Sequence, residues 1–289
     1  MKILITGANG MLAKAVENEL KNEKLILTDV SELDITNLEN VRKVVKENKP
    51  EYIINCAAYT AVDKAEEQKE LARKVNADGP KNLAIVAKEE NCTLIHISTD
   101  YVFGGDKDVN EAYTEEEEKN PVTVYGITKL EGEKNILNMC PKYYIFRTAW
   151  LYGDGNNFVR TMLKLGHEHD EINVVADQHG SPTYSVDLAN IIHQAIQKKI
   201  PYGIYHATNL GYTTWYDFTK LIFKKANVNC KVNPVTTEQF PRPAKRPLNS
   251  QLSKDKILKE GINIPNFEDA LDRYLNVEIN LKGNSSYEK

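Results

Sequence analysis

The chain has 289 residues, enough for one large domain or two modest ones with a sizeable buried core. Its 41 acidic and 37 basic residues leave a formal net charge of −4, so no bulk positive field is present to attract nucleic acid. No stretch approaches the roughly 20 apolar residues of a membrane-spanning helix, and no membrane partner is expected. The 4 cysteines lie far apart without a C-x-x-C pair, which predicts a cytoplasmic protein with reduced thiols.

Short apolar runs alternate with longer amphipathic segments through the first half of the chain. Apolar strands that alternate with helices indicate a parallel sheet with helices on both faces. The sequence therefore predicts an α/β fold in which residues 1–150 form a doubly wound, Rossmann-like parallel sheet that binds a dinucleotide. The expected strands are 2–6, 24–29, 51–58, 93–99 and 143–150, and the expected helices are 13–21, 38–48, 70–90 and 125–140.

The alternation loosens after Trp150. Residues 151–280 are expected to form mainly a smaller substrate-binding region, and the segment from about 184 to 200 is a candidate for returning to the first domain. The segment 227–253 is rich in proline, asparagine and arginine and is predicted to be loop with little strand. The helices still expected in this part are 157–169, 185–199 and 213–227.

The motif TGANGMLA directly follows the first expected strand and opens the first expected helix. Gly7 and Gly10, with Ala13 at the third position, let the backbone turn sharply and approach a pyrophosphate. The N-terminus of the helix offers unpaired N–H groups to the same anion. Because a strand precedes the motif and a helix follows it, the motif is more specific than a chance glycine pattern and predicts a dinucleotide cofactor.

Asp29 ends the second expected strand, where a carboxylate can bind the ribose hydroxyls of adenosine. This position favours NADH over NADPH, because a carboxylate repels a 2′-phosphate. A plain turn with a surface aspartate is the alternative. Asp34 and Ile35 are candidates for touching the adenine, although an aspartate that opens a helix is also a common N-cap.

In the stretch VYGITKLEGE, Tyr125 and Lys129 are four residues apart on an expected helix and so project from one face. An ammonium beside a phenol stabilises the phenolate and lowers the tyrosine pKa from about 10, so that the phenol can exchange a proton with a substrate. The same spacing also arises by chance on many helices. Thr99 or Ser98 would emerge beside this pair in a doubly wound sheet, where either hydroxyl could bind a carbonyl.

The patterns G-x-x-G-x-x-A, N-x-A-A, S-T-D and Y-x-x-x-K occur in this order and at suitable distances. This succession resembles the extended, nucleotide-sugar-modifying branch of the short-chain dehydrogenase/reductase superfamily. Within that branch, segments such as YTAVDKAE, STDYVFGG and ADQHGSPT are similar to the dTDP-4-dehydrorhamnose reductases, from Met1 to about Leu252. The resemblance implies reduction of the C4 ketone of dTDP-4-dehydro-β-L-rhamnose to dTDP-L-rhamnose, with NADH or NADPH as cofactor.

The resemblance also implies roles for individual residues. Tyr125 would donate the proton, Lys129 would hold the nicotinamide ribose and support the phenolate, and Thr99 would orient the sugar. Asp100 and Trp150 would face the sugar nucleotide with Thr99, and the indole would serve as a stacking wall. The residues implied for the cofactor are Gly10, Met11 and Leu12 at the pyrophosphate, Asp29 at the ribose, Asp34 and Ile35 at the adenine, and Ala58, Tyr59 and Thr60 at the central stretch.

Asp63 and Arg246 are weaker candidates for the substrate site. A carboxylate beside a lysine can pair locally instead, and the arginine lies in a proline-stiffened loop, where it could bind a diphosphate or stay solvated. Some relatives hold Mg²⁺ between subunits through glutamates, one of them on the first helix. Ala15 stands at that place, so we expect no metal and either a monomer or a weak homodimer. The acidic run Glu115–Glu118 is predicted to be a solvated loop.

Two other functions fit the same motifs. A nucleotide-sugar epimerase uses the same tyrosine–lysine pair but keeps NAD bound and consumes none. A non-catalytic regulatory subunit on this scaffold could lose Tyr125 or Lys129 without penalty, so the presence of both together with Thr99 favours catalysis. NADPH stays an alternative to NADH, because a lysine such as Lys24 could soften the repulsion by Asp29.

Overall fold

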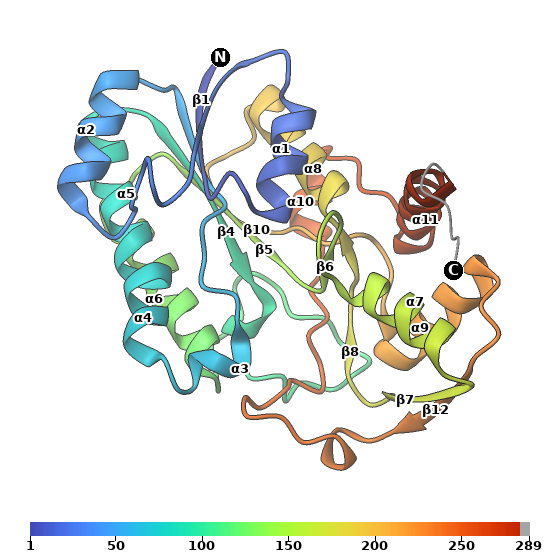
Figure 1. Ribbon diagram of the computed structural model, residues 1–289. Helices are drawn as coiled ribbons and strands as arrows, with labels where there is room; N and C mark the ends of the chain where they lie inside the picture. The colour runs from blue at the N-terminus through green and yellow to red at the C-terminus, as the bar shows by residue number, and fades with distance from the viewer. Residues whose placement is uncertain (284–289) are drawn as a thin grey trace.

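Six parallel strands form the central sheet of the computed structural model, which describes residues 1–283 (Figure 1). Their order is β10-β5-β4-β3-β1-β2. Because β1 lies between β2 and β3, the strand order reverses at β1, and the predicted doubly wound sheet is confirmed. The strands are β1 (Lys2–Thr6), β2 (Lys24–Thr28), β3 (Tyr52–Asn55), β4 (Thr93–Thr99), β5 (Tyr143–Thr148) and β10 (Gly203–His206).

The inner strands β1, β3, β4 and β5 are buried on both faces, as their apolar runs predict, whereas the edge strand β2 is partly exposed. Ile3 and Ile5 belong to the core on one side of β1, and Leu4 belongs to the core on the other, because successive side chains of a strand point to opposite faces. Helices cover both cores (Figure 1). The first core lies under α1 (Met11–Glu19), α8 (Ser185–Lys198) and α10 (Asp255–Lys259), and the second under α2 (Leu38–Asn48), α5 (Gly79–Glu89) and α6 (Val124–Met139).

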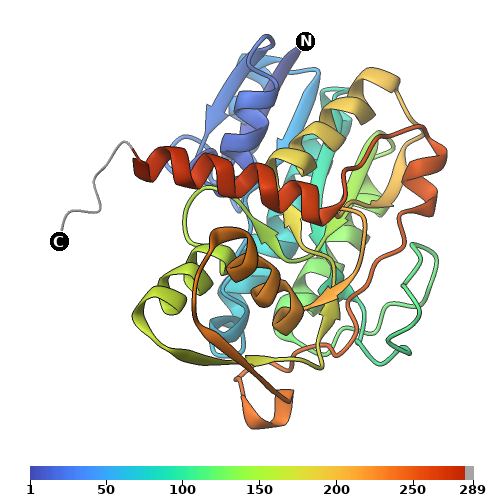
Figure 2. The same ribbon diagram turned by 90° about the vertical axis from the view of Figure 1, so that its right-hand side faces the viewer.

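A smaller part of the chain packs around a third, largely aromatic core, which includes Tyr152, Phe218 and Tyr274. The long helix α11 (dark red in Figure 2) joins this part to the first, because Arg273 forms an ion pair of 2.7 Å with Asp187 of α8. The elements of this part are β6 (Leu151–Tyr152), α7 (Phe158–Glu168), β7 (Glu171–Val175), β8 (His179–Gly180), β9 (Thr183–Tyr184), β11 (Thr213–Thr214), α9 (Trp215–Ala226), β12 (Lys231–Val235) and α11 (Phe267–Gly283).

The chain crosses between the two parts more than once. It leaves the central sheet after β5 and returns in α8, which packs on α1, and in β10, which pairs with β5. The returning segment therefore extends beyond the expected 184–200, because it includes the edge strand β10. The segment expected to be mostly loop, 227–253, contributes β12, which pairs with β7.

Short elements connect the strands near the site. They are α3 (Val62–Ala65), α4 (Lys69–Arg73), and the helical turns η1 (Lys74–Asp78), η2 (Asp100–Val102) and η3 (Thr237–Gln239). Within the part of the chain that the structure describes, no helix combines the length and apolar character needed to cross a bilayer. Over residues 1–283, no three His, Cys, Asp or Glu side chains gather at metal-binding range.

Candidate active site

The glycine turn after β1 allows a close backbone approach. Gly7 has a φ of 65°, and a Cβ there would lie 2.9 Å from the Cα of Ala57, so no side chain fits. Gly10 is the N-cap of α1 and provides no side-chain hydrogen bond, which leaves the first N–H groups of the helix for an anion. The turn therefore has the geometry of a pyrophosphate site.

The aspartate at the end of β2 is tied to this turn. The Asn9 N–H donates to Asp29 Oδ2 at 3.0 Å, and the Val30 N–H donates to Oδ1 at 2.8 Å. The carboxylate thus lies directly beside the glycine turn.

The segment expected at the adenine is held in another way. Asp34 Oδ1 accepts from the N–H and the hydroxyl of Thr36, at 2.9 and 2.7 Å. The Ile35 side chain is buried in the core beneath α2 and α5. Backbone atoms, and not the Ile35 side chain, are therefore what this segment can present to an adenine.

A cavity of about 460 Å³ opens at the ends of β3, β4 and β5, beside the start of α1. The expected cofactor and substrate residues that line it are Gly10, Met11, Leu12, Ala58, Thr60, Thr99, Asp100, Tyr125, Lys129 and Trp150. The expected residues that do not line it are Gly7, Asp29, Asp34, Ile35, Tyr59, Asp63 and Arg246. The Tyr59 hydroxyl donates to Gln68 Oε1 at 2.9 Å instead.

Tyr125 lies in the first turn of α6, and its hydroxyl lies near Thr99 at the end of β4. Thr99 donates its one hydroxyl proton to Asp100 Oδ1 at 2.8 Å, so its oxygen can only accept from a further partner such as the Tyr125 hydroxyl. Burial raises the pKa of Tyr125 to about 12, which the Asp100 charge reinforces and the Thr99 hydrogen bond opposes. The phenol is therefore protonated at neutral pH.

Asp100 presents a free acceptor to the same space. Its Oδ2 is buried and has no hydrogen-bond partner among the described residues. Burial raises the pKa of Asp100 to about 6, against the hydrogen bond from Thr99. A sugar hydroxyl that reached the cavity could donate to this oxygen.

A close contact at Gly126 holds the start of α6 against η2, which directly follows β4. A Cβ at Gly126 would lie 2.2 Å from the backbone oxygen of Tyr101 in η2, so α6 can approach η2 this closely only with glycine here. We expect Gly126→Ala to push the helix away, to destabilise the fold by roughly 1–3 kcal/mol, and to lower turnover by moving Tyr125 from Thr99.

The matched control for this substitution is Gly203→Ala in β10. A Cβ at Gly203 would meet only Tyr205 Cε2, at 3.8 Å, so the control should keep wild-type stability and turnover. Thermal unfolding and turnover measured on both variants test the contact. Equal behaviour of the two variants would show that the approach of α6 to η2 is not constrained by Gly126.

The Lys129 amine hydrogen-bonds to β4 and not to Tyr125. Its Nζ donates to the backbone oxygen of Ile97 at 2.5 Å and lies 3.4 Å from His96 Nε2. Burial lowers the pKa of Lys129 to about 8, and the Glu133 carboxylate opposes this shift. Burial of the phenol outweighs any other influence on the Tyr125 pKa in this structure, and stabilisation of a phenolate by Lys129 stays a prediction.

Ser98, the alternative to Thr99, is engaged by a buried ion pair. Its hydroxyl donates to Glu133 Oε1 at 2.5 Å, and Arg147 binds both oxygens of that carboxylate, at 2.9 and 2.7 Å. Thr99 is therefore the hydroxyl that remains for a substrate. Sequence reasoning missed Glu133, although it lies four residues after Lys129 on the helix face that carries Tyr125.

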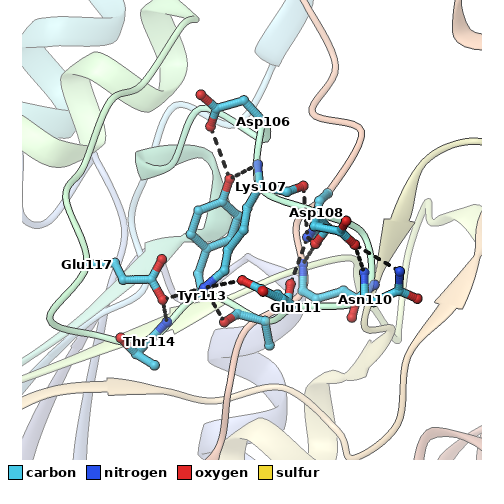
Figure 3. Close-up of polar contacts among 11 residues, drawn as sticks. Asp106, Lys107, Asp108, Asn110, Glu111, Tyr113, Thr114 and Glu117 are labelled. Atoms are coloured by element: carbon cyan, nitrogen blue, oxygen red, sulfur yellow. Dashed lines mark hydrogen bonds and ion pairs between the residues drawn. The ribbon is translucent and has the colours of Figure 1, made fainter.

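The connection between η2 and α6 folds on itself (Figure 3). The Tyr113 hydroxyl accepts from the Lys107 N–H at 3.0 Å and donates to Asp106 Oδ1 at 3.3 Å. Lys107 Nζ pairs with Glu117 at 2.7 Å, and the Thr114 N–H donates to the same carboxylate at 2.9 Å. These contacts give the loop beside the site a defined shape.

The acidic run Glu115–Glu118 was predicted to be solvated, and this is wrong for Glu115. Its side chain is buried and accepts from the N–H of His206 at 2.8 Å. This contact forms because β10 is an edge strand, whose last N–H has no neighbouring strand on one side. Glu116 and Glu117 pair with Lys256 and Lys107, respectively.

A second cavity, of about 450 Å³, lies between α7, β7 and the loop after β12. Asp63 and Arg246 both line it and form an ion pair of 2.9 Å, and Arg242 lines it as well. The structure thus brings these two weaker candidates together, and each is the other's partner.

A smaller cavity, of about 200 Å³, lies between the first two. It shares Asp100 and Trp150 with the first cavity, and Trp215 and Arg246 with the second. The indoles of Trp150 and Trp215 stack with their ring centroids 3.5 Å apart. The three cavities therefore form one row that runs from the glycine turn to the arginines.

Comparison with known proteins shows which proteins the chain is similar to over nearly its whole length. A family profile described as "RmlD substrate binding domain" matches residues 1–279. The chain is 42% identical to a dTDP-4-dehydrorhamnose reductase of Aggregatibacter actinomycetemcomitans, over 93% of the chain and 97% of the relative. A solved dTDP-4-dehydrorhamnose reductase of Clostridium acetobutylicum is 51% identical, with a TM-score of 0.93 over 96% of this chain and 99% of that one. The Bacillus anthracis enzyme, solved in complex with NADP, is 43% identical, with a TM-score of 0.91 over 95% and 98%.

Proposed function

Because the chain belongs to the dTDP-4-dehydrorhamnose reductase family of NAD(P)H-dependent oxidoreductases, we propose that it reduces the C4 ketone of dTDP-4-dehydro-β-L-rhamnose to dTDP-L-rhamnose. One observation carries the proposal: a single cavity is lined by the start of α1, Thr99 and Tyr125. The row of cavities from there to Arg242 and Arg246 suits a substrate with a sugar at one end and a nucleotide at the other.

The residues of the first cavity and of the adjoining glycine turn fit a nicotinamide dinucleotide. The uncapped N-terminus of α1 would hold the pyrophosphate, Asp29 the adenosine ribose, and Lys129 the nicotinamide ribose. Ala58 and Thr60 would lie along the central stretch of the cofactor. When bound, the cofactor supplies the hydride.

Tyr125 gives its proton to the C4 oxygen as negative charge develops there. The raised pKa of Tyr125, about 12, keeps the proton on the phenol until a basic oxygen is formed. Thr99 orients the phenol by accepting from it, and Asp100 fixes the direction of the Thr99 hydroxyl. The Lys129 ammonium stabilises the phenolate that remains on Tyr125.

Consumption of added cofactor separates this reaction from its alternatives. Purified protein is incubated with dTDP-4-dehydrorhamnose and with NADH or NADPH, and the absorbance of the reduced cofactor is followed. We expect one cofactor to be oxidised for each sugar reduced. Conversion of the sugar without cofactor consumption would support an epimerase, and no turnover with any deoxyhexulose nucleotide would support a regulatory subunit.

For the cofactor we propose a preference for NADH, because the Asp29 carboxylate would repel a 2′-phosphate. Acceptance of NADPH is supported by the NADP complex of the B. anthracis reductase. We expect Asp29→Asn to raise kcat/KM for NADPH relative to NADH by roughly 10-fold, the scale of one charge–charge contact near a surface.

The control for the cofactor test is Glu32→Gln. Glu32 Oε2 accepts from the Asp29 N–H at 3.0 Å, so the control removes a neighbouring charge and leaves the Asp29 carboxylate. Its NADPH/NADH ratio should stay close to that of the wild type. An equal shift in both variants would mean that general surface charge, and not Asp29, sets the preference.

A further inference from the structure

A row of buried polar side chains crosses the sheet from the glycine turn to Lys129. Thr6, the last residue of β1, donates its hydroxyl to Asn55 Oδ1 at 2.6 Å. Asn55 Nδ2 lies 3.0 Å from His96 Nδ1, and His96 Nε2 lies 3.4 Å from Lys129 Nζ. The four side chains come from β1, β3, β4 and α6, and none is more than 2% exposed. The proposed reaction assigns no role to His96.

The direction of each hydrogen bond in this row is determined by its first members. The backbone N–H of Ala57 also donates to Asn55 Oδ1, at 3.2 Å, and a backbone N–H can only donate. The Asn55 atom that receives Ala57 and Thr6 must therefore be the amide oxygen. The amide NH₂ of Asn55 then faces His96, so His96 Nδ1 is an acceptor and carries no proton.

His96 is consequently fixed in one tautomer. Burial and the nearby Lys129 charge hold the pKa of His96 well below its usual range, so the ring is neutral. A neutral imidazole without a proton on Nδ1 carries its proton on Nε2. The Nε2–H of His96 therefore points at the Lys129 amine.

This arrangement favours the uncharged form of Lys129. An uncharged amine can accept from the His96 Nε2–H while it still donates to the Ile97 oxygen. An ammonium has only donors, so its contact with the Nε2–H places two donors against each other. The ammonium keeps the Ile97 hydrogen bond and loses the one from His96.

The other charged groups near Lys129 oppose this effect or leave it unchanged. Glu133 lies one helical turn further along α6 and favours the ammonium, but Arg147 of β5 neutralises much of its charge. The Cys56 thiol after β3 is kept protonated by burial, which raises its pKa to about 12. Tyr125 on α6 is likewise a neutral phenol. Among the described residues, only His96 and the Ile97 oxygen lie within hydrogen-bond range of Nζ.

We propose that His96 is a positioning residue, which Asn55 and Thr6 hold as the Nε2–H tautomer. In this tautomer His96 donates to the uncharged Lys129 amine and so favours loss of the Lys129 proton. The use of that charge in catalysis rests on the proposed function, whereas the tautomer itself does not. The consequence is a rate of reduction that falls as pH rises through the Lys129 pKa, because an uncharged amine no longer stabilises the Tyr125 phenolate. Through Thr6, the row also links Lys129 to the glycine turn.

The tautomer can be measured in the wild-type protein without substrate. Nitrogen-15 NMR of protein labelled in its histidines distinguishes Nε2–H, Nδ1–H and charged imidazoles, and His96→Gln identifies the His96 signals. We expect a neutral Nε2–H ring throughout pH 6 to 9. A charged ring or an Nδ1–H ring would overturn the proposal, whatever the outcome of the turnover assay.

A second variant tests the effect on Lys129. Asn55→Asp replaces the amide NH₂ by an acceptor, so His96 must place its proton on Nδ1 and turn a lone pair to Lys129. We expect the NMR titration of the Lys129 Cε, assigned with Lys129→Met, to move up by about one pH unit or more.

The double variant Asn55→Asp/His96→Leu is the matched control, because it adds the same carboxylate without the imidazole. A larger upward shift in Asn55→Asp than in the double variant supports the proposal. Equal shifts would mean that the new charge acts without His96 and would overturn it. If Asn55→Asp does not fold, the nitrogen-15 NMR measurement of the His96 tautomer in the wild-type protein is sufficient to support or overturn the proposal.

Discussion

Tyr125→Phe is expected to lower kcat for sugar reduction by about 10²-fold or more, the scale expected when a positioned proton donor is removed. The phenyl ring keeps the packing of Tyr125 against Tyr101, which lies edge-on at 5.5 Å between ring centroids, so stability and cofactor binding should change little. Steady-state turnover, cofactor titration and thermal unfolding of the same preparation test these three expectations.

Tyr152→Phe is the control for this substitution. The Tyr152 hydroxyl is buried in the third core and has no hydrogen-bond partner among the described residues, so its removal should not lower turnover. If Tyr125→Phe turned over substrate at the control's rate, another group would have to deliver the proton.

Arg147→Met is expected to destabilise the protein by about 3–5 kcal/mol, because it leaves the Glu133 carboxylate buried without its partner. Both side chains are only 1% exposed, so water cannot replace the lost contact. The loss should appear as a lower urea midpoint with an unchanged slope. Turnover should fall as well, since Ser98 and the end of β4 depend on the same carboxylate.

The double variant Glu133→Leu/Arg147→Met should regain much of that stability, since replacing a buried ion pair by apolar residues of similar volume is often neutral. Arg42→Met, which breaks an exposed pairing with Glu39 and Glu89, should cost far less than Arg147→Met. A double variant as unstable as the single one would mean that Arg147 stabilises the fold through contacts other than Glu133.

The central sheet was predictable because its signals are local. Ile3, Leu4 and Ile5 are apolar in succession, as a strand buried on both faces requires, and a glycine turn and an amphipathic helix follow them directly. The strands of the first half were therefore found within a few residues of their ends. The expected site residues in the first cavity all lie at or after the ends of such strands, or in the first two turns of α1 and α6.

The residues that sequence reasoning missed depend on contacts between distant segments. Glu115 is buried only because it meets the edge strand β10, 91 positions away in the sequence. No local pattern marks His96 in its strand, and the role proposed for it depends on Asn55 and Lys129, which lie on either side of it. The pKa of Tyr125 depends on how deeply the phenol is buried, which its spacing from Lys129 does not reveal.

Isotope transfer tests the central claim most directly. Reduced cofactor that carries deuterium at C4 of the nicotinamide is incubated with the protein and dTDP-4-dehydrorhamnose, and the product is analysed by mass spectrometry and proton NMR. The account predicts dTDP-L-rhamnose with one deuterium at C4 of the sugar. The deuterium should be transferred from only one of the two faces of the nicotinamide ring. A product without deuterium, or with deuterium at another carbon, would contradict hydride transfer to the C4 ketone in this cavity.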